Sequence, residues 1–500
     1  MGIASAMAIL AACPAGSHRS DVPTTAAASP GTGRPRLVGC TVRGDLLCGS
    51  VEVPLDRAHP AAGTISVVFY VHRRSDTDAP AAEPVFVTPG GPGSSGLQAM
   101  EFVLQMDTIV EHHDIVAIDP RGTGRSGAIE CPDLQDGWRD AREMNAAVRA
   151  CGEHLGDAAD RYGAGDVAMD VEAVRRALGY DRIDFYAFSY GTVPEQAYAA
   201  RFPGRIHALV LDAGMSVTDP RHVWAWELGV PGALVRTVSL MCAQDPTCPV
   251  EDPALTIRRV VHRTAVEPLR GTVRPPGGTP REVVVDQAEL AHLLQSTGTC
   301  TLCGEIAPSL TLAAFASFRE GRPDELLHLA DGNGRGPLVT PPAATEFSAG
   351  DNIAAFCNDQ DFVWGRSDPV GVRVRKFREA LAALPNDAFA PFSKRGWSAF
   401  TWPAGCLRWP VPDRFEPAIP SGAVFPDVPT LILAGDHDTT VPPAVVETLR
   451  GEFPRAAFVT VAGAGHPVAG PAWGHCADRL VARLFDTLRV GDTSCAAVPA

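Results

Sequence analysis

The sequence predicts an α/β protein in which a mostly parallel sheet carries helices on both faces and is interrupted by a large, mostly helical insertion. Short, almost entirely apolar runs alternate with helical segments, which is typical of parallel strands buried on both faces. These runs are 84–87, 115–118, 183–187, 208–211, 430–434 and 457–461. Between Met215 and Pro426 the alternation fades, and Pro and Gly clusters separate helical patches.

This pattern divides the chain into four parts. Residues 1–36 combine an apolar N-terminal stretch with a flexible tether rich in Ser, Thr, Ala, Pro and Gly. Residues 37–215 are expected to form the first part of the sheet domain, and residues 216–426 a lid. Residues 427–500 are expected to complete the sheet domain.

The N-terminal stretch has features of an export signal. Leu10-Ala11-Ala12-Cys13 resembles a bacterial lipobox, in which the chain is cleaved before a cysteine that becomes lipidated. The apolar residues 3–12 are too few to span a bilayer. No Lys or Arg precedes them, although signal peptides start with basic residues. The prediction is an exported protein, either a lipoprotein anchored through Cys13 or a secreted protein in which Cys13 is incidental.

Composition limits the partners that we expect. The formal net charge is −15, which argues against non-specific nucleic-acid binding. Most of the 13 cysteines lie in close pairs, which points to an oxidising compartment, and twelve remain without Cys13. Cys300 and Cys303 have a zinc-like spacing, but no second pair with His spacing accompanies them, so we expect no metal.

The first part of the chain places two special loops directly after strands. A strand is expected over 64–71. The run 84–87 leads into the glycine turn 88–93, and the run 115–118 leads into the loop 119–126. A helix is expected over 166–179, because apolar residues recur on one face and Gly179 stops it.

Ser189 stands at the centre of a strand–turn–helix pattern. It follows the run 183–187, lies between Ala187 and Gly191, and precedes a helix expected over 195–201. Small-x-Ser-x-small between a strand and a helix is the nucleophile-elbow pattern, although Gly is usual where Ala187 stands. The small residues are needed because a larger side chain would collide with the neighbouring strand or helix.

The lid and the closing part supply the remaining elements. Helices are expected in the lid over 289–294, 310–318 and 372–384. The strand 430–434 then leads into Gly435-Asp436-His437-Asp438, and the strand 457–461 leads into a glycine turn that ends at His466. A closing helix is expected over 478–488.

Ser189, Asp438 and His466 are the predicted catalytic residues. A serine hydroxyl needs a base to take its proton and an acid to orient that base. Each of the three residues follows a strand, and strand ends at one edge of a parallel sheet lie together. Their order along the chain is that of the α/β hydrolases. His466 would be the base and Asp438 its partner, with Asp436 as the alternative acid.

The oxyanion of a tetrahedral intermediate needs backbone donors. We expect one donor from Tyr190, directly after the nucleophile, and one from Gly91 in the glycine turn. The alternative is that 89–93 is only a tight turn. A nucleotide site at Gly122 and Gly124 is not expected, because neither the full glycine fingerprint nor a Gly-Lys-Ser follows.

Several motifs together resemble the secreted tripeptidyl aminopeptidases, in the proline-iminopeptidase group of α/β hydrolases. They are Pro89–Gly93, Asp119–Ser126, Ser189–Thr192, Cys357 with Cys406-Leu407-Arg408-Trp409-Pro410, Gly435–Pro442, and Gly465-His466. The resemblance extends from about Cys40 to Cys495. It implies a serine exopeptidase without cofactor that forms an acyl-enzyme on Ser189 and releases short peptides or single residues from free N-termini.

The resemblance also implies disulfides and shows departures. The implied bridges are Cys40–Cys48, Cys131–Cys151, Cys242–Cys248, Cys357–Cys406 and Cys476–Cys495, which leaves Cys300 and Cys303 as a sixth pair. Thr88, Ala187 and Val441 differ from the residues usual in the family. None of them removes a catalytic group, so they bear on substrate range.

An aminopeptidase must recognise a charged amine, for which lid carboxylates are the natural partners. The candidates are Glu346, Asp351, Asp359 and Asp361; Asp359 is preferred and Glu346 is retained beside it. The alternative is a solvated acidic loop. We expect a monomer acting on peptides. The competing functions are a carboxylesterase or lipase-like hydrolase with the same triad, and a catalytically silent surface-binding protein.

Overall fold

The computed structural model describes residues 35–499 except 107, 137–140, 220–223, 275–277, 299–305, 333–341, 399–401, 413 and 415. Its centre is a nine-stranded sheet with the order β1-β2-β3-β5-β4-β6-β7-β10-β11. The strands are β1 Val38–Gly39, β2 Leu47–Pro54, β3 Thr64–His72, β4 Val85–Thr88, β5 Ile115–Ile118, β6 Ile183–Phe188, β7 Ile206–Asp212, β10 Thr430–Gly435 and β11 Ala456–Val461.

The six strands from β5 to β11 are parallel, and β1, β2 and β3 are paired antiparallel at one edge. Every residue of β4, β5 and β10 is buried, as their apolar sequences predict. Alternate side chains of β5 point to opposite faces of the sheet. Val116 and Ile118 belong to the larger core, and Ile115 and Ala117 belong to the smaller core on the other face. The predicted α/β fold class is confirmed.

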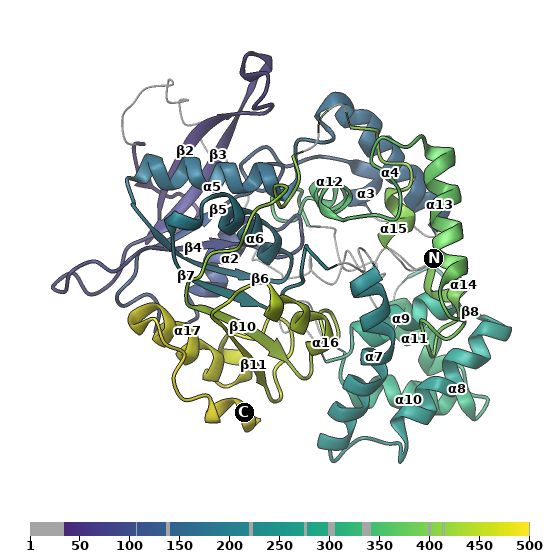
Figure 1. Ribbon diagram of the computed structural model, residues 1–500. Helices are drawn as coiled ribbons and strands as arrows, with labels where there is room; N and C mark the ends of the chain where they lie inside the picture. The colour runs from purple at the N-terminus through teal and green to yellow at the C-terminus, as the bar shows by residue number, and fades with distance from the viewer. Residues whose placement is uncertain are drawn as a thin grey trace.

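Helices cover both faces of this sheet (Figure 1). On one face lie α5 (Ala164–Leu178) and α6 (Thr192–Arg201), which contribute to the larger core. On the other lie α2 (Gly96–Val103) and α17 (Cys476–Thr487). Helix α5 ends at Gly179, whose φ of 81° is the left-handed conformation typical of a helix C-terminus.

The lid lies between β7 and β10. Its helices are α7 Trp224–Gln244, α8 Pro253–Val266, α9 Gln287–Gln295, α10 Pro308–Arg319, α11 Asp324–Gly332, α12 Ala349–Asp359, α13 Val370–Ala383, α14 Lys394–Ser398 and α15 Trp402–Cys406. Helices α9 and α10 cover two of the ranges expected from the sequence, and α13 covers the third except for its last residue, Leu384. A hairpin of β8 (Leu269–Val273) and β9 (Arg281–Val285) was not predicted, because its half-exposed strands carry charged residues.

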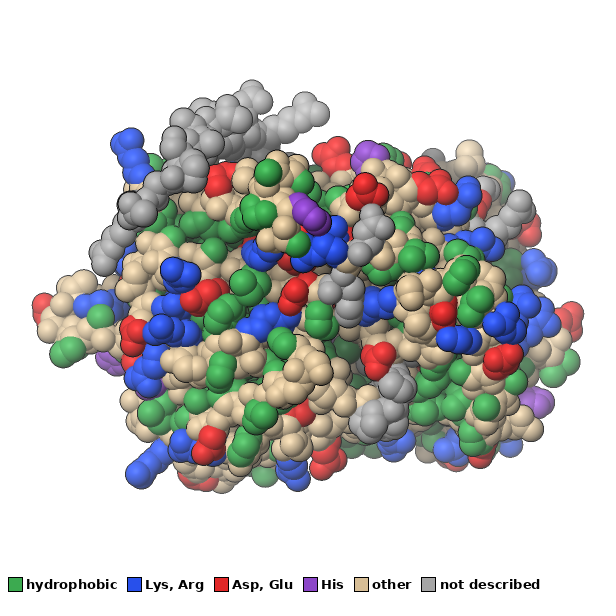
Figure 2. Space-filling view, turned by 45° about the horizontal axis from the view of Figure 1, so that its top comes forward, with side chains coloured by type: hydrophobic (Ala, Val, Ile, Leu, Met, Phe, Trp, Pro, Cys, Tyr) green, Lys and Arg blue, Asp and Glu red, His purple; other side chains and the backbone are tan. Residues whose placement is uncertain are grey.

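Figure 1 shows most lid helices gathered at one side of the sheet, whereas α12 and α15 lie by α3 (Pro132–Gln135) and α4 (Ala141–Leu155) of the sheet domain. Acidic and basic side chains are interspersed over the face shown in Figure 2. The lid therefore meets the sheet domain along α12, the helix that approaches the strand ends.

Within the described residues there are five disulfides, and they are the five pairs that the family resemblance implies: Cys40–Cys48, Cys131–Cys151, Cys242–Cys248, Cys357–Cys406 and Cys476–Cys495. Such a number of bridges is typical of exported proteins. Cys13, Cys300 and Cys303 lie outside the described residues. In the described ranges no helix has the length and apolarity needed to cross a bilayer, and no cluster of three or more His, Cys, Asp or Glu is placed to hold a metal ion.

The loop after β5 is a structural support rather than a phosphate loop. Asp119 accepts hydrogen bonds from the N–H groups of Gly96 and Arg125, both at 2.7 Å. The fully buried Arg121 donates to both carboxylate oxygens of Asp170, at 2.7 and 2.8 Å. These bonds join the end of β5 to the start of α2 and to α5.

Candidate active site

Ser189 occupies a strained turn between β6 and α6. Its φ of 57° lies in the left-handed region, where residues other than glycine are uncommon. A Cβ atom at Gly191 would lie 2.5 Å from the carbonyl oxygen of Thr88 and 2.6 Å from that of Pro89, so only glycine fits there. This is the geometry of a nucleophile elbow, which presents the serine hydroxyl at the end of the sheet.

His466 and Asp438 meet at the same edge of the sheet. The Nδ1 atom of His466 lies 2.8 Å from Oδ2 of Asp438, and both side chains are buried. The other oxygen of Asp438 accepts the N–H groups of Thr440 at 2.7 Å and Val441 at 2.8 Å. Among the described residues Nε2 of His466 has no hydrogen-bond partner, so this nitrogen is available to exchange a proton.

The surroundings of His466 favour its charged form. Burial alone would lower the pKa of His466, but the carboxylates of Asp438 and Asp212 outweigh it and leave the pKa raised. Such a histidine is a stronger base and stabilises the imidazolium that forms when it takes a proton.

The structure decides between the two candidate acids. Asp436 accepts the N–H of Gly463 at 2.7 Å and makes no hydrogen bond to His466. Asp438 is therefore the carboxylate that orients the imidazole. The nearby His475 is paired with Asp478 instead, at 3.0 Å.

The glycine turn after β4 passes directly against the nucleophile. A Cβ atom at Gly90 would lie 3.0 Å from Cβ of Ser189. Gly91 has a φ of 114°, which favours glycine, and its N–H has no hydrogen-bond partner within the described part of the chain. The hydroxyl of Thr88 donates to the carbonyl of Gly191 at 3.0 Å, so this departure from the family pattern joins the turn to the elbow.

The lid helix α12 holds the same turn from the other side. The N–H of Ser348 donates to the carbonyl of Gly93 at 2.9 Å, and Nδ2 of the buried Asn352 donates to the carbonyl of Pro92 at 2.7 Å. A Cβ atom at Gly93 would lie 2.5 Å from the carbonyl oxygen of Ser348, so glycine is required there. The sequence analysis did not identify Asn352, because a single Asn inside a helix carries no pattern that reports a contact over 260 positions.

Asp359 and Asp351 lie eight residues apart on α12; Asp359 contacts Tyr190, and the charge of Asp351 contributes to the raised pKa of Tyr190 after burial and Asp359. The Tyr190 hydroxyl donates to Asp359, which also accepts the N–H of Ala164 at 2.7 Å. Burial raises the pKa of Asp359 to about 6, against the opposing effect of the Tyr190 bond. Asp351 is only 3% exposed, and its carboxylate has no hydrogen bond or ion pair with any described residue. Burial, and next the charge of Asp359, raise the pKa of Asp351 well above its usual value.

The structure places the two amine-binding candidates, Asp359 and Glu346, in different surroundings. Glu346 and Asp361 are exposed, whereas Asp351 is buried on the same helix as Asp359. Glu346 precedes the N-cap Ser348 and so lies outside the helix face that carries Asp351 and Asp359. Without the helix register, the sequence could not separate these acids.

The comparisons with known proteins agree with this geometry. Residues 83–239 match the family described as alpha/beta hydrolase fold, and residues 391–495 match the family described as TAP-like protein. The chain is an α/β hydrolase.

Three curated relatives cover most of the hydrolase. Serine protease Hip1 of Mycobacterium tuberculosis is 28% identical over 454 residues, 85% of this chain and 82% of the relative. Tripeptidyl aminopeptidase of Streptomyces lividans is 24% identical over 463 residues, 85% of this chain and 78% of the relative. Carboxylesterase B of Mycobacterium tuberculosis is 27% identical over 424 residues, 79% of this chain and 76% of the relative. The chain is thus a serine hydrolase of the α/β fold related to Hip1 and to tripeptidyl aminopeptidase.

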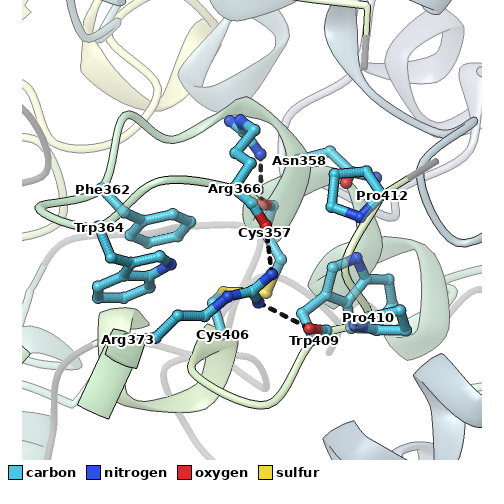
Figure 3. Close-up of a pocket in the computed structure, with 10 residues that line it drawn as sticks. All are labelled: Cys357, Asn358, Phe362, Trp364, Arg366, Arg373, Cys406, Trp409, Pro410 and Pro412. Carbon is cyan, nitrogen blue, oxygen red and sulfur yellow. Dashed lines mark hydrogen bonds between the residues drawn. A yellow bond between two sulfur atoms is a disulfide. The ribbon is translucent and has the colours of Figure 1, made fainter. Parts of the chain in front are cut away.

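A pocket in the lid of the hydrolase lies apart from these catalytic groups. Figure 3 shows Arg373 reaching across it to donate to the carbonyls of Trp409, at 2.7 Å, and Arg366. The Cys357–Cys406 disulfide borders the same pocket and ties α12 to α15. Arg366 in turn donates to the carbonyls of Cys357, at 3.0 Å, and Gln360, at 2.8 Å, so we interpret this region as a support that holds the C-terminal end of α12 and with it Asp359.

One buried acid at the strand ends was missed. Asp212 is the last residue of β7, is fully buried, and is among the charges that raise the pKa of His466. The signal was in the sequence, since Asp212 directly follows the apolar run 208–211 just as Asp438 follows soon after 430–434.

Proposed function

We propose that the hydrolase is an exported, monomeric serine aminopeptidase that releases short peptides or single residues from free N-termini. The observation that carries the proposal is the pair Asp351 and Asp359, buried on the lid helix beside Tyr190. Tyr190 follows the nucleophile in sequence, so a cation bound by the pair would lie near the reacting carbonyl. A buried carboxylate without a partner is costly, and a substrate ammonium group would supply that partner. The relatives named as serine protease and tripeptidyl aminopeptidase support the same reading.

The proposed reaction follows from the positions of the side chains. Oγ of Ser189 attacks the carbonyl carbon of the scissile peptide bond while Nε2 of His466 takes the hydroxyl proton. The N–H groups of Gly91 and Tyr190 stabilise the oxyanion. His466 then gives its proton to the leaving amine, which leaves an acyl-enzyme on Ser189. Water activated by the same histidine hydrolyses the acyl-enzyme and regenerates the serine.

A carboxylesterase is the second candidate. The same triad cleaves esters, and the relative named Carboxylesterase B covers most of the chain. An esterase would have no use for a buried pair of carboxylates beside the nucleophile, which is why we favour the peptidase.

The two candidates are separated by three chromogenic substrates: a tripeptide anilide with a free N-terminus, its N-acetylated form, and a short acyl ester. For the aminopeptidase we expect cleavage of the free anilide and little cleavage of the acetylated one. Asp351→Asn should lower kcat/KM for the free anilide by roughly 10- to 100-fold, because the ammonium loses its buried counter-charge. The ester should be cleaved at the wild-type rate.

The same variant should be more stable than the wild type at neutral pH. A carboxyl group whose pKa is raised by folding destabilises the folded state once the pH exceeds the unfolded value, here 3.8. Asp351→Asn removes this penalty, so its Tm should exceed that of the wild type at pH 7 and approach it near pH 4.

Glu346→Gln is the matched control for both predictions, and it is expected to change neither Tm nor kcat/KM. Equal cleavage of both anilides, or ester cleavage alone, would rule out the aminopeptidase.

We further propose that Cys13 is lipidated and anchors the exported hydrolase to the membrane. The lipobox-like residues 10–13 and the five disulfides support this proposal. Cys13→Ser should move the protein from the detergent phase to the aqueous phase in a Triton X-114 partition of expressing cells. An unchanged partition would show that Cys13 is not the anchor.

A further inference from the structure

We infer that Asp212 is a positioning residue that fixes the loop carrying His466, and through it the direction of the catalytic imidazole. Strand β7, which Asp212 ends, lies between β6 and β10 in the sheet. Those two strands lead to Ser189 and Asp438. Asp212 is therefore located between the nucleophile and the acid, at the edge of the sheet where the triad assembles.

Both carboxylate oxygens of Asp212 are engaged by the histidine loop. Oδ1 accepts the N–H of Val468 at 2.8 Å, and Oδ2 accepts the N–H of Ala469 at 2.9 Å. These residues follow His466 by two and three positions. The Tyr186 hydroxyl also donates to Oδ2, at 2.9 Å. An amide in place of the carboxylate would offer only one oxygen, and its NH₂ group would face another donor.

Asp212 is not a second triad acid, because Nδ1 of His466 is already occupied by Asp438. It acts through the backbone and through its charge. The titratable groups that face it are His466 and Tyr186, and Tyr186 in turn faces Asp478 and Glu195. Burial raises the pKa of Asp212 to about 6, although the N–H groups of Ala469 and Val468 oppose this shift. The three donors that face its two oxygens fit the ionised carboxylate.

The neighbouring N–H group is held in the same way. Oδ1 of Asp478, on α17, accepts the N–H of Gly470 at 2.6 Å. Three consecutive backbone donors after His466 and Pro467 are therefore fixed by two buried carboxylates. Of these two carboxylates, Asp212 and not Asp478 is among the charges that raise the pKa of His466.

The test measures Asp212→Asn with the short acyl ester, whose cleavage does not depend on amine recognition. Turnover is divided by the concentration of active sites, titrated with a serine-reactive fluorophosphonate. We expect kcat per titrated site to fall roughly 10- to 100-fold with little change in KM, because a small misplacement of a catalytic group costs about this much. The acid limb of the kcat/KM profile should move to lower pH, since one carboxylate that favours the imidazolium is gone.

Controls separate positioning from stability. Asp184→Asn changes another fully buried aspartate, at the start of β6, where it is bonded to His207. Whatever its effect on Tm, this variant should leave kcat per titrated site and the acid limb unchanged. A wild-type kcat per titrated site in Asp212→Asn would overturn the inference. An acid limb at the wild-type pH would also overturn it.

Two further variants keep the test decisive. If Asp212→Asn does not fold, Tyr186→Phe removes one of the three bonds to Asp212 and should reduce kcat per titrated site by a smaller factor; a wild-type kcat would overturn the inference. The inference rests on the proposed role of His466, so His466→Ala is measured beside it. Full activity in His466→Ala would refute the proposed mechanism, whereas its loss with an active Asp212→Asn would refute only the role of Asp212.

Discussion

Ser189→Ala is expected to lower kcat by roughly 10⁴- to 10⁶-fold on both peptide and ester substrates. In the proposed mechanism this hydroxyl forms the acyl-enzyme, and without it the remaining groups can only bind substrate and polarise its carbonyl. KM should change little, because Ser189 contacts the substrate mainly at the reacting carbon. Single-turnover kinetics with purified protein lacking residues 1–36 would measure the loss.

Ser239→Ala is the control for this experiment. Its hydroxyl donates to the carbonyl of Val235 within α7, so the variant removes a serine hydroxyl away from the elbow and should retain full activity. A loss of less than about 100-fold in Ser189→Ala would contradict the assignment, given the size of effect that nucleophile removal produces. The fluorophosphonate adduct, located by mass spectrometry, would then show which residue is the nucleophile.

Asp438→Asn should lower kcat by about 10⁴-fold, because an amide opposite Nδ1 of His466 favours the wrong imidazole tautomer and no longer stabilises the imidazolium. The folded structure should survive, since the Asn oxygen can still accept the N–H of Thr440 or Val441. The pKa of His466 should fall with the loss of its principal carboxylate partner, so the acid limb of any remaining activity should move to lower pH.

Asp436→Asn is the matched control, with the same chemical change two residues earlier. Its oxygen can still accept the N–H of Gly463, and Nδ1 of His466 is bonded to Asp438 instead. We expect kcat within a few-fold of the wild type, as is usual for a partly exposed site away from the reacting groups. A larger loss in Asp436→Asn than in Asp438→Asn would reverse the assignment of the acid.

The sequence by itself determined the parts of this hydrolase that depend on local pattern. Central strands such as 115–118 are apolar throughout because helices bury both of their faces, and such runs are visible without a structure. Small residues are required around Ser189 because the turn is sharp, and all of them lie within a few positions of the serine. Residues that follow parallel strands within a few positions lie at one edge of the sheet, so Ser189, Asp438 and His466 could be predicted as a group from their sequence positions, and the structure joins Asp438 to His466.

Tertiary structure alone decided which groups support and complete this site. Helix α12 carries Asp351 and Asp359 at buried positions, whereas Glu346 lies before the helix and is exposed, and the spacing of these acids along the sequence does not report this difference. Asn352 reaches Pro92 across 260 positions, and Asp212 holds the backbone that follows His466. These contacts are made between segments that fold from distant parts of the chain, so their energies depend on packing and burial, which appear only when the lid and the sheet are assembled.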